Sequence, residues 1–192
     1  MKFTSFNNWK LMETKKVKEQ SKKTEYGCIM LYTTVPNWDK HIDKIEKDDI
    51  YDDKFKDYGL EHTPHVTVLF GIHLDETKPE DVKKVLKLFK PVIAYIDTIG
   101  TFENKDFDVV KYNVPVTPLL KLYHEAVMAA FPNTQTFPDY HPHMTIAYVL
   151  PEKGKKYKGG VKPFKVTFDT AVYSYAGKNG ERERIKVKLK ND

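Results

Sequence analysis

The stretch HTPHVTVLFG (residues 62–71) decides how this chain is interpreted, because its central part occurs a second time. PHVTVLF (64–70) and PHMTIAY (142–148) share a proline, a histidine, one apolar residue, a threonine, two apolar residues and an aromatic residue, in that order. A repeat with polar residues at matching places indicates a duplicated structural unit.

Both copies have the composition of a β-strand that begins at the histidine. Side chains alternate between the two faces of a strand, so we expect His65 and Thr67 to share one face, as do His143 and Thr145. Two such strands side by side would bring two imidazoles and two hydroxyls to a shared cleft. Two imidazoles can act as general base and general acid, and two hydroxyls can donate to phosphate oxygens. This set suits phosphoryl transfer without a metal ion.

The rest of the chain alternates between strand and helix patterns. Apolar and β-branched runs predict strands at 27–35, 65–70, 91–102, 107–116, 143–150, 164–176 and 183–190. Apolar residues at helical spacing predict helices at 37–50, 78–90 and 117–131, with Pro79 and Pro118 in the first turns of the last two. The mixture predicts an α+β fold.

Composition limits the class of protein. With 40% apolar and 13% aromatic residues, the chain is expected to fold as a globule. No apolar run reaches the length of a membrane span, and the first twenty residues lack the apolar core of a signal peptide. We therefore predict a cytoplasmic protein, in which the single Cys28 is a small core residue. The net charge of +5 suits an anionic partner.

Two basic segments stand out. Residues 1–25 contain the basic run 10–23, and apolar residues at helical spacing in 3–12 predict a short helix that could bind a protein partner. Residues 152–162 (EKGKKYKGGVK) predict a mobile loop between strands, whose lysines could contact phosphate.

The paired motifs resemble those of the 2H phosphoesterase superfamily, in which two H-x-T motifs each begin a strand. The superfamily includes 2′-5′ RNA ligase-like proteins, cyclic phosphodiesterases and phage enzymes that degrade cyclic nucleotide defence signals. The resemblance extends over residues 26 to 189 and implies one bilobal domain (26–192) with antiparallel sheets of duplicated β-α-β units lining a central cleft. It implies His65 and His143 as the catalytic acid and base, and Thr67 and Thr145 as phosphate ligands. HMTIAYV fits the pattern of the family well, whereas HVTVLFG is bulkier.

The expected activity is that of a metal-independent phosphodiesterase acting on 2′-5′ linked or cyclic (oligo)nucleotides. The Lys-rich and Asp-rich composition favours a phage enzyme that degrades host cyclic nucleotide defence signals. Three alternatives stay open: RNA-end processing of 2′,3′-cyclic phosphates or 2′-5′ joints, a noncatalytic nucleotide-binding module, and a structural protein in which the repeat only packs. We expect a monomer that needs no cofactor and has no membrane partner.

A metal site is the alternative use of the histidines. His62, His65, His141 and His143 are enough ligands for zinc. Such a site would leave Thr67 and Thr145 without a role, and so we expect no metal. His141 is instead predicted to support the site or contact substrate, whereas His41, His73 and His124 are assigned no role.

Aromatic side chains are candidates for stacking on a nucleobase. Tyr173 and Tyr175 share one strand face and form the preferred pair; the other candidates are Tyr32, Trp38, Phe70 and Tyr140. Strict alternation predicts that Tyr148 faces away from Thr145 and packs. Lysines that could steer a polyanion toward the cleft are Lys111, Lys153, Lys155, Lys156 and Lys158.

Overall fold

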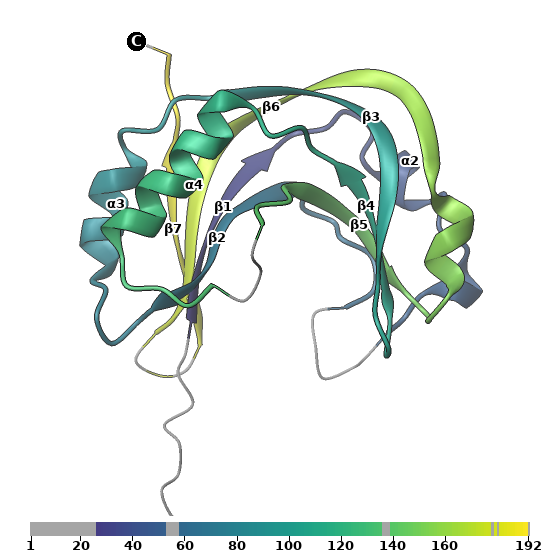
Figure 1. Ribbon diagram of the computed structural model, residues 1–192, viewed down its shortest axis with the longest axis horizontal. Helices are drawn as coiled ribbons and strands as arrows, with labels where there is room; N and C mark the ends of the chain where they lie inside the picture. The colour runs from purple at the N-terminus through teal and green to yellow at the C-terminus, as the bar shows by residue number, and fades with distance from the viewer. Residues whose placement is uncertain (1–25, 53–57, 136–138, 178, 180, 192) are drawn as a thin grey trace, which may run out of the picture.

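The computed structural model describes residues 26–52, 58–135, 139–177, 179 and 181–191 (Figure 1). The predicted N-terminal helix and its proposed partner-binding role lie outside these residues. The elements in order are β1 (Tyr26–Thr33), α2 (Asp39–Ile42), the 3-10 helix η1 (Lys47–Asp49), β2 (His65–His73), α3 (Pro79–Leu86), β3 (Val92–Glu103), β4 (Asp108–Asn113), α4 (Pro118–Ala130), β5 (His143–Val149), the 3-10 helix η2 (Lys153–Tyr157), β6 (Gly159–Ala176) and β7 (Arg182–Lys188).

The strands form one antiparallel sheet in the order β2-β1-β6-β3-β4-β5, with β7 paired to β6. Figure 1 shows the sheet bent into an arch. The two strands at opposite ends of this order, β2 and β5, contact each other. The bend therefore brings together the two strands that carry the repeated motif.

The sheet order reveals a duplication in which the two copies exchange their last strands. The first repeat runs from β1 to β3 and the second from β4 to β6. One half of the sheet, which we call the first half, contains β1, β2 and β6; the second half contains β4, β5 and β3. This confirms the predicted α+β fold of duplicated β-α-β units, with the difference that pairing of β3 with β6 joins both halves into one sheet.

The helices also cross between the halves. Helix α4 contacts β2 and α3 contacts β6, so both pack on the first half, whereas α2 contacts β5 and η2 contacts β3 and β4 (Figure 1). Both longer helices turn an apolar stripe toward the sheet: Val82 and Leu86 of α3, and Leu120 and Val127 of α4, are completely buried. Full burial of such side chains contributes about 1.5 to 3 kcal/mol each.

The predicted helix at 37–50 is wrong in extent. Only α2 and η1 form: Asn37 before the N-cap Trp38 adopts a left-handed conformation (φ 56°), and α2 ends at Ile42 with Asp43 as its C-cap. Two short turns allow Ile45 and Asp49 both to point inward. By contrast, α4 forms as predicted, with the Thr117 hydroxyl accepting from Leu120 N at 3.2 Å.

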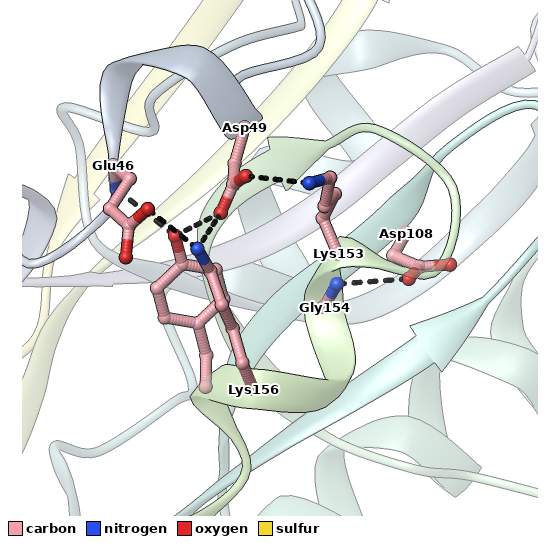
Figure 2. Close-up of polar contacts among 7 residues, drawn as sticks. Glu46, Asp49, Asp108, Lys153, Gly154 and Lys156 are labelled. Atoms are coloured by element: carbon pink, nitrogen blue, oxygen red, sulfur yellow. Dashed lines mark hydrogen bonds and ion pairs between the residues drawn. The ribbon is translucent and has the colours of Figure 1, made fainter.

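The predicted mobile loop at 152–162 is also wrong. Its first part is η2, and its last residues begin β6. Figure 2 shows Lys153 and Lys156 pointing from η2 at Asp49, with Lys156 Nζ 2.7 Å and Lys153 Nζ 3.7 Å from its carboxylate. The Tyr157 hydroxyl donates to the same carboxylate at 2.5 Å. Partners more than a hundred positions earlier in the chain therefore fix this segment, which its local composition does not reveal.

Candidate active site

Each motif histidine opens its strand with the same hydrogen bond. Nδ1 of His65 lies 2.8 Å from the carbonyl oxygen of Thr63, and Nδ1 of His143 lies 2.8 Å from that of His141. A carbonyl oxygen can only accept, so Nδ1 carries the proton in both rings. Nε2 of each imidazole is then the atom that can take up or release a proton.

The proline before each histidine holds this geometry. The carbonyl oxygens of Pro64 and Pro142 accept from Thr33 N at the end of β1 and from Val114 N directly after β4, each at 3.1 Å. A proline also restricts the residue before it to extended conformations. These contacts anchor the main chain next to the carbonyl oxygen that accepts from each histidine.

The structure brings the two motifs together across the contact of β2 with β5. Burial is the main cause that lowers the pKa of His143, and the positive charges of Lys111, His65 and His141 lower it further, against the hydrogen bond to His141, which raises it. The two imidazoles therefore lie within electrostatic reach of each other. Thr67 and Thr145 follow on the same strands with half-buried side chains.

A cavity of about 910 Å³ opens beside the motifs. One polar residue of each motif, Thr67 and His143, lines it. Its walls are largely aromatic: Phe70, Phe102, Phe107, Tyr140 and Tyr148. Within the described part of the chain, His65 and Thr145 are not among the lining residues. The volume lies in the range of small-molecule and cofactor sites.

An irregularity in the strand pairing recurs in both repeats. In the first, Ile29 pairs with Leu69 and the next residue, Met30, pairs with Thr67, so β2 contains one more residue than β1 at this point. In the second, Val110 pairs with Ala147 and Lys111 with Thr145. Each is a β-bulge, and it shifts the alternation of side chains by one position.

The bulges overturn the prediction that Tyr148 faces away from Thr145. Beyond each bulge the aromatic residue of the motif, Phe70 or Tyr148, returns to the face of the histidine, and both line the cavity. Strict alternation misses this. The signal in the sequence is the pair of consecutive apolar residues before each aromatic residue, Val68-Leu69 and Ile146-Ala147.

Two aromatic side chains hold the first bulge from outside the sheet. His124 Nδ1 lies 2.7 Å from the carbonyl oxygen of Val68, and the Tyr140 hydroxyl donates to that of Thr67 at 3.0 Å. The two rings stack on each other, with centroids 4.1 Å apart and planes 5° from parallel. The sequence assigned no role to His124, whereas the structure places it on the cavity wall.

A lysine distinguishes the second half of the sheet. Lys111 is buried, with 7% of its surface exposed, and its Nζ donates to Asn113 Oδ1 at 2.5 Å and lies 4.3 Å from the centre of the Phe102 ring. Burial lowers the pKa of Lys111. The Phe102 ring meets the His143 ring edge-on, with centroids 4.9 Å apart. Of the lysines that the sequence predicted to steer a polyanion, Lys111 is therefore the one that lies beside a motif histidine.

The preference for Tyr173 and Tyr175 as the stacking pair is not supported by their positions. Tyr173 is completely buried and pairs with Ile29 in the core. Cys28, the neighbour of Ile29 on β1, lines the cavity and so belongs to the opposite face of the sheet. Tyr175 stacks on Tyr173 at 5.0 Å and donates to Glu183 at 2.8 Å. Both therefore belong to the packed face of the sheet.

The other candidate residues divide between cavity and core. His141 lines the cavity. Tyr32 lies against His65, with ring centroids 5.4 Å apart. Trp38 is buried and donates to the carbonyl oxygen of Glu61 at 2.7 Å. Cys28, predicted as a core residue, lies on the cavity wall, where burial raises its pKa to about 12.

The lysines of η2 and its surroundings pair with carboxylates. Lys155 and Lys158 lie 3.8 Å and 2.6 Å from Glu103, and Lys156 contacts Glu46 as well as Asp49. Their charges are therefore largely compensated within the fold. Among the described residues, no group of three or more His, Cys, Asp or Glu side chains could hold a metal ion. No helix in this part of the chain is long and apolar enough to cross a membrane.

Known proteins match this chain by sequence family and by fold. The family model described as the 2'-5' RNA ligase superfamily matches residues 34–171. The fold is similar to that of E. coli LigT complexed with 3'-AMP (TM-score 0.55, 14% identity, 88% of this chain and 100% of that chain). It is also similar to a phosphoesterase (TM-score 0.53, 12% identity, 88% and 100%) and to Kluyveromyces marxianus Usb1 with uridine monophosphate (TM-score 0.53, 12% identity, 85% and 98%).

A comparison with curated proteins gives no match. At 11 to 14% identity the solved structures support the fold alone. The family model covers most of the chain, from the end of β1 into β6, and includes both motifs. The chain therefore belongs to the 2'-5' RNA ligase superfamily of 2H phosphoesterases.

Proposed function

We propose that this protein is a phosphodiesterase that cleaves nucleotide substrates by general acid and base catalysis with His65 and His143. The supporting observation is the matched pair of Nδ1 to carbonyl hydrogen bonds, which leaves Nε2 of both rings for proton exchange. LigT and Usb1, which share the fold, have been crystallised with 3'-AMP and uridine monophosphate, and this supports a nucleotide as the ligand.

The chemistry follows from the two imidazoles. When a ribose hydroxyl neighbours the scissile phosphate, the base removes its proton and the hydroxyl oxygen forms a bond to phosphorus. The bond from phosphorus to the leaving oxygen breaks, and the acid protonates that oxygen, which gives a 2′,3′-cyclic phosphate and a free hydroxyl. The hydroxyls of Thr67 and Thr145 donate to the non-bridging oxygens, on which negative charge accumulates. A 2′,3′-cyclic phosphate substrate would react with water in place of the ribose hydroxyl.

The difference between the two halves supports His143 as the base and His65 as the acid. The groups facing His143 are Lys111 from β4, His65 from β2 and His141 from the preceding loop, and all are cationic when protonated. A neutral imidazole is favoured there. Beside His65, the place of Lys111 is taken by Met30, which pairs with Thr67 as Lys111 pairs with Thr145.

The surroundings of His65 include a carboxylate. Glu61 Oε1 accepts from Thr63 N at 2.8 Å, and the carbonyl of Thr63 accepts from His65. The Tyr32 ring also lies against His65, with ring centroids 5.4 Å apart. The Glu61 carboxylate is therefore bound to the N–H of Thr63, the residue whose carbonyl oxygen positions the His65 ring.

The substrate proposed is a 2′-5′ linked or cyclic (oligo)nucleotide. RNA-end processing is the rival, because the same atoms can act on a terminal 2′,3′-cyclic phosphate. The viral anti-defence role, the cytoplasmic location and the monomeric state stay predictions from the sequence.

Incubation of the purified protein in EDTA tests this function. The panel contains 2′-5′ linked oligoadenylate, a 3′,3′ cyclic dinucleotide, a cyclic trinucleotide and an RNA with a 2′,3′-cyclic phosphate end, with products separated by chromatography. We expect cleavage that is reduced about 10²- to 10⁴-fold in His65→Ala and in His143→Ala. His73→Ala is the matched control, because His73 bonds Glu76 and Thr134 at the far end of β2.

Each other outcome has a defined meaning. Binding without turnover in the wild-type protein would indicate a noncatalytic nucleotide-binding module. Turnover that EDTA removes would indicate a metal-dependent reaction and contradict the two-histidine mechanism. Full activity in either histidine variant would remove that residue from the chemistry.

A further inference from the structure

We propose that a basic row on β7, formed by Arg182, Arg184 and Lys186, binds the phosphate backbone of an oligonucleotide whose scissile phosphate lies between the motif histidines. This inference rests on the proposed function and adds to it a binding surface outside the cavity. It selects substrates that carry further phosphates beyond the one that is cleaved.

The sequence of β7 divides its side chains between two faces, because alternate residues of a strand point to opposite sides. Ile185 and Val187 are half-buried and pack against the hydrophobic core. They lie on the side of α3, which contacts β7. Arg182, Arg184 and Lys186 occupy the alternate positions and are exposed. The basic row therefore points away from α3.

The strand register connects the basic row to the active site. Directly paired residues in an antiparallel sheet have their side chains on the same face. Thr67 on β2 pairs with Met30 on β1. Met30 pairs with Val172 on β6, and Val172 pairs with Lys186 on β7. The basic row therefore lies on the face of the sheet that carries Thr67, the proposed phosphate ligand.

A second line of pairs runs beside the first. Phe70 pairs with Cys28, and both residues line the cavity. Cys28 pairs with Ser174 on β6, which pairs with Arg184 on β7. Each line crosses three steps between strands of about 4.8 Å, so the main chain of β7 lies about 14 Å along the sheet from that of β2. A ligand that contacts both strands must therefore be longer than one phosphodiester.

The two arginines act across β6 on residues of the active site. Burial raises the pKa of Cys28 to about 12, and the charge of Arg182 is among the causes that oppose this shift. Burial also raises the pKa of Tyr32, and the charge of Arg184 opposes it. The Tyr32 ring lies 5.4 Å from the His65 ring. The guanidinium groups therefore lie between the outer strand and the first motif.

The charges of the basic row have no acidic partners in the part of the chain that the structure describes. Lys188, the next basic residue of β7, lies 2.6 Å from Asp169, and the lysines of η2 also pair with carboxylates. Glu183 lies between two residues of the row, but its carboxylate accepts from the Tyr175 hydroxyl on the other face. The row is thus available to an external anion.

Continuity with the active site decides which polyanion fits. A guanidinium donates two parallel hydrogen bonds to a phosphate, and an ammonium binds it as a point charge. The successive cations of the row suit the regularly spaced phosphates of a nucleic-acid strand. An acidic protein would also be attracted, but it offers no phosphodiester to the histidines on the same face.

Two substrates with the same scissile linkage test this inference. One is the adenylyl dinucleotide in the linkage that the protein cleaves, and the other is the hexanucleotide in that linkage. In the triple variant Arg182→Gln/Arg184→Gln/Lys186→Gln, the ratio of kcat/KM on the hexanucleotide to kcat/KM on the dinucleotide should fall about tenfold or more at low salt. An unchanged ratio would overturn the proposal.

The salt dependence of binding measures how many phosphates the row contacts. Each contact to a single strand contributes about 0.7 to the slope of log affinity against log salt concentration. The probe is a fluorescent adenylyl hexamer in the same linkage, with its internal hydroxyls O-methylated so that it is not cleaved. Loss of three contacts in the triple variant should reduce the slope by about 2. An unchanged slope would show that the row does not contact the backbone.

Two control variants separate local contact from net charge. Arg182→Lys/Arg184→Lys keeps both charges and should retain most of the slope. Lys83→Gln/Lys84→Gln/Lys87→Gln removes three charges on and directly after α3, behind the row, and should change neither ratio nor slope. Equal effects of the two triple variants would reduce the row to a long-range charge effect and overturn the proposal. Thermal unfolding shows whether each variant is folded.

The binding measurement also separates failure of this inference from failure of the proposed function. Hexamer binding that the β7 triple variant weakens, without wild-type turnover, would support the basic row and refute the catalytic function. Turnover with an unchanged ratio would refute the basic row alone. Equally tight binding of a hexaglutamate peptide, weakened by the same variant, would assign the row to an acidic protein and overturn the proposal.

Discussion

Lys111 and Met30 occupy the same position in the two halves of the sheet. Lys111 pairs with Thr145, two residues after His143, and Met30 pairs with Thr67, two residues after His65. The duplication makes the two imidazoles equivalent, and the exchange of a cation for a thioether contributes to making them unequal. The inequality is what an enzyme with one acid and one base requires.

Replacing Lys111 by Met should therefore change the pH dependence of the reaction. The pKa of His143 is lowered by burial and by nearby positive charges, including Lys111. Removing that charge raises the pKa, so a higher pH is needed to obtain the neutral base. In Lys111→Met, the acidic limb of the kcat/KM profile should move to higher pH while the basic limb stays in place.

Lys165→Met is the control, because Lys165 is exposed on β6 and should shift neither limb. Histidine Cε1–H shifts followed by NMR measure the same pKa without turnover. Movement of the basic limb instead would exchange the roles of the two histidines.

Tyr140→Phe should disturb the first bulge while keeping the stack on His124. Burial raises the pKa of Tyr140, so its hydroxyl stays protonated and donates to the carbonyl of Thr67. Loss of this hydrogen bond should reduce the free energy of unfolding by about 1 kcal/mol. Because Thr67 is the proposed phosphate ligand, kcat should fall while the calorimetric Kd for nucleotide changes less. Tyr95→Phe is the matched control, and an unchanged kcat in Tyr140→Phe would show that the bulge does not depend on this hydroxyl.

The motif residues could be predicted from sequence because they depend on local rules. A histidine and a threonine two positions apart on a strand share a face whatever the rest of the chain does. The bulge beyond Thr145 depends on how two strands pair, and strict alternation therefore placed Tyr148 on the wrong face. Likewise, the alternating pattern of its strand does not reveal whether Tyr173 is exposed or buried. Its pairing with Ile29 places it in the core.

Partners distant in sequence explain the remaining differences. Lys156 was expected to be free in a loop because its neighbours are glycine and lysine. Its partner is Asp49, which no local pattern connects to it. The role of His124 is similarly invisible from sequence, since it depends on the carbonyl oxygen of Val68 at a bulge.

Gly71 should be required for the segment that covers the outer edge of β2. Its φ is +98°, and a Cβ at this position would collide with the carbonyl oxygen of Thr134, whose own N donates to Gly71 O at 2.9 Å. Gly71→Ala combines left-handed strain with this collision, so we expect a loss of at least about 1 to 2 kcal/mol of unfolding free energy. At Gly160, a Cβ would meet only Asp97 O at 3.9 Å, and Gly160→Ala should be close to neutral. Equal stability of the two variants in urea would contradict this explanation.

Asp49→Asn should destabilise the contact between η1 and η2 in a pH-dependent way. The Asp49 side chain is 3% exposed, and its pKa is lowered by hydrogen bonds to Lys156 and Tyr157, against the effect of burial. A carboxylate whose folded pKa lies below its unfolded value of about 3.9 stabilises the fold above that pH, and this stabilisation is lost as the pH falls through the folded pKa. At pH 7 we expect a loss of about 1 to 3 kcal/mol in Asp49→Asn. Asp48→Asn, at an exposed neighbour, should lose little.

The difference between wild type and Asp49→Asn should therefore shrink below about pH 4, when the wild-type carboxylate also becomes neutral. Urea unfolding at pH 7 and at several values below pH 4 measures it. A difference that stays constant over this range would mean that Asp49 stabilises the protein by packing and not by its charge. Because η2 contacts β3 and β4, which carry Phe102 and Lys111, this charge network also supports the half of the sheet that holds the proposed base.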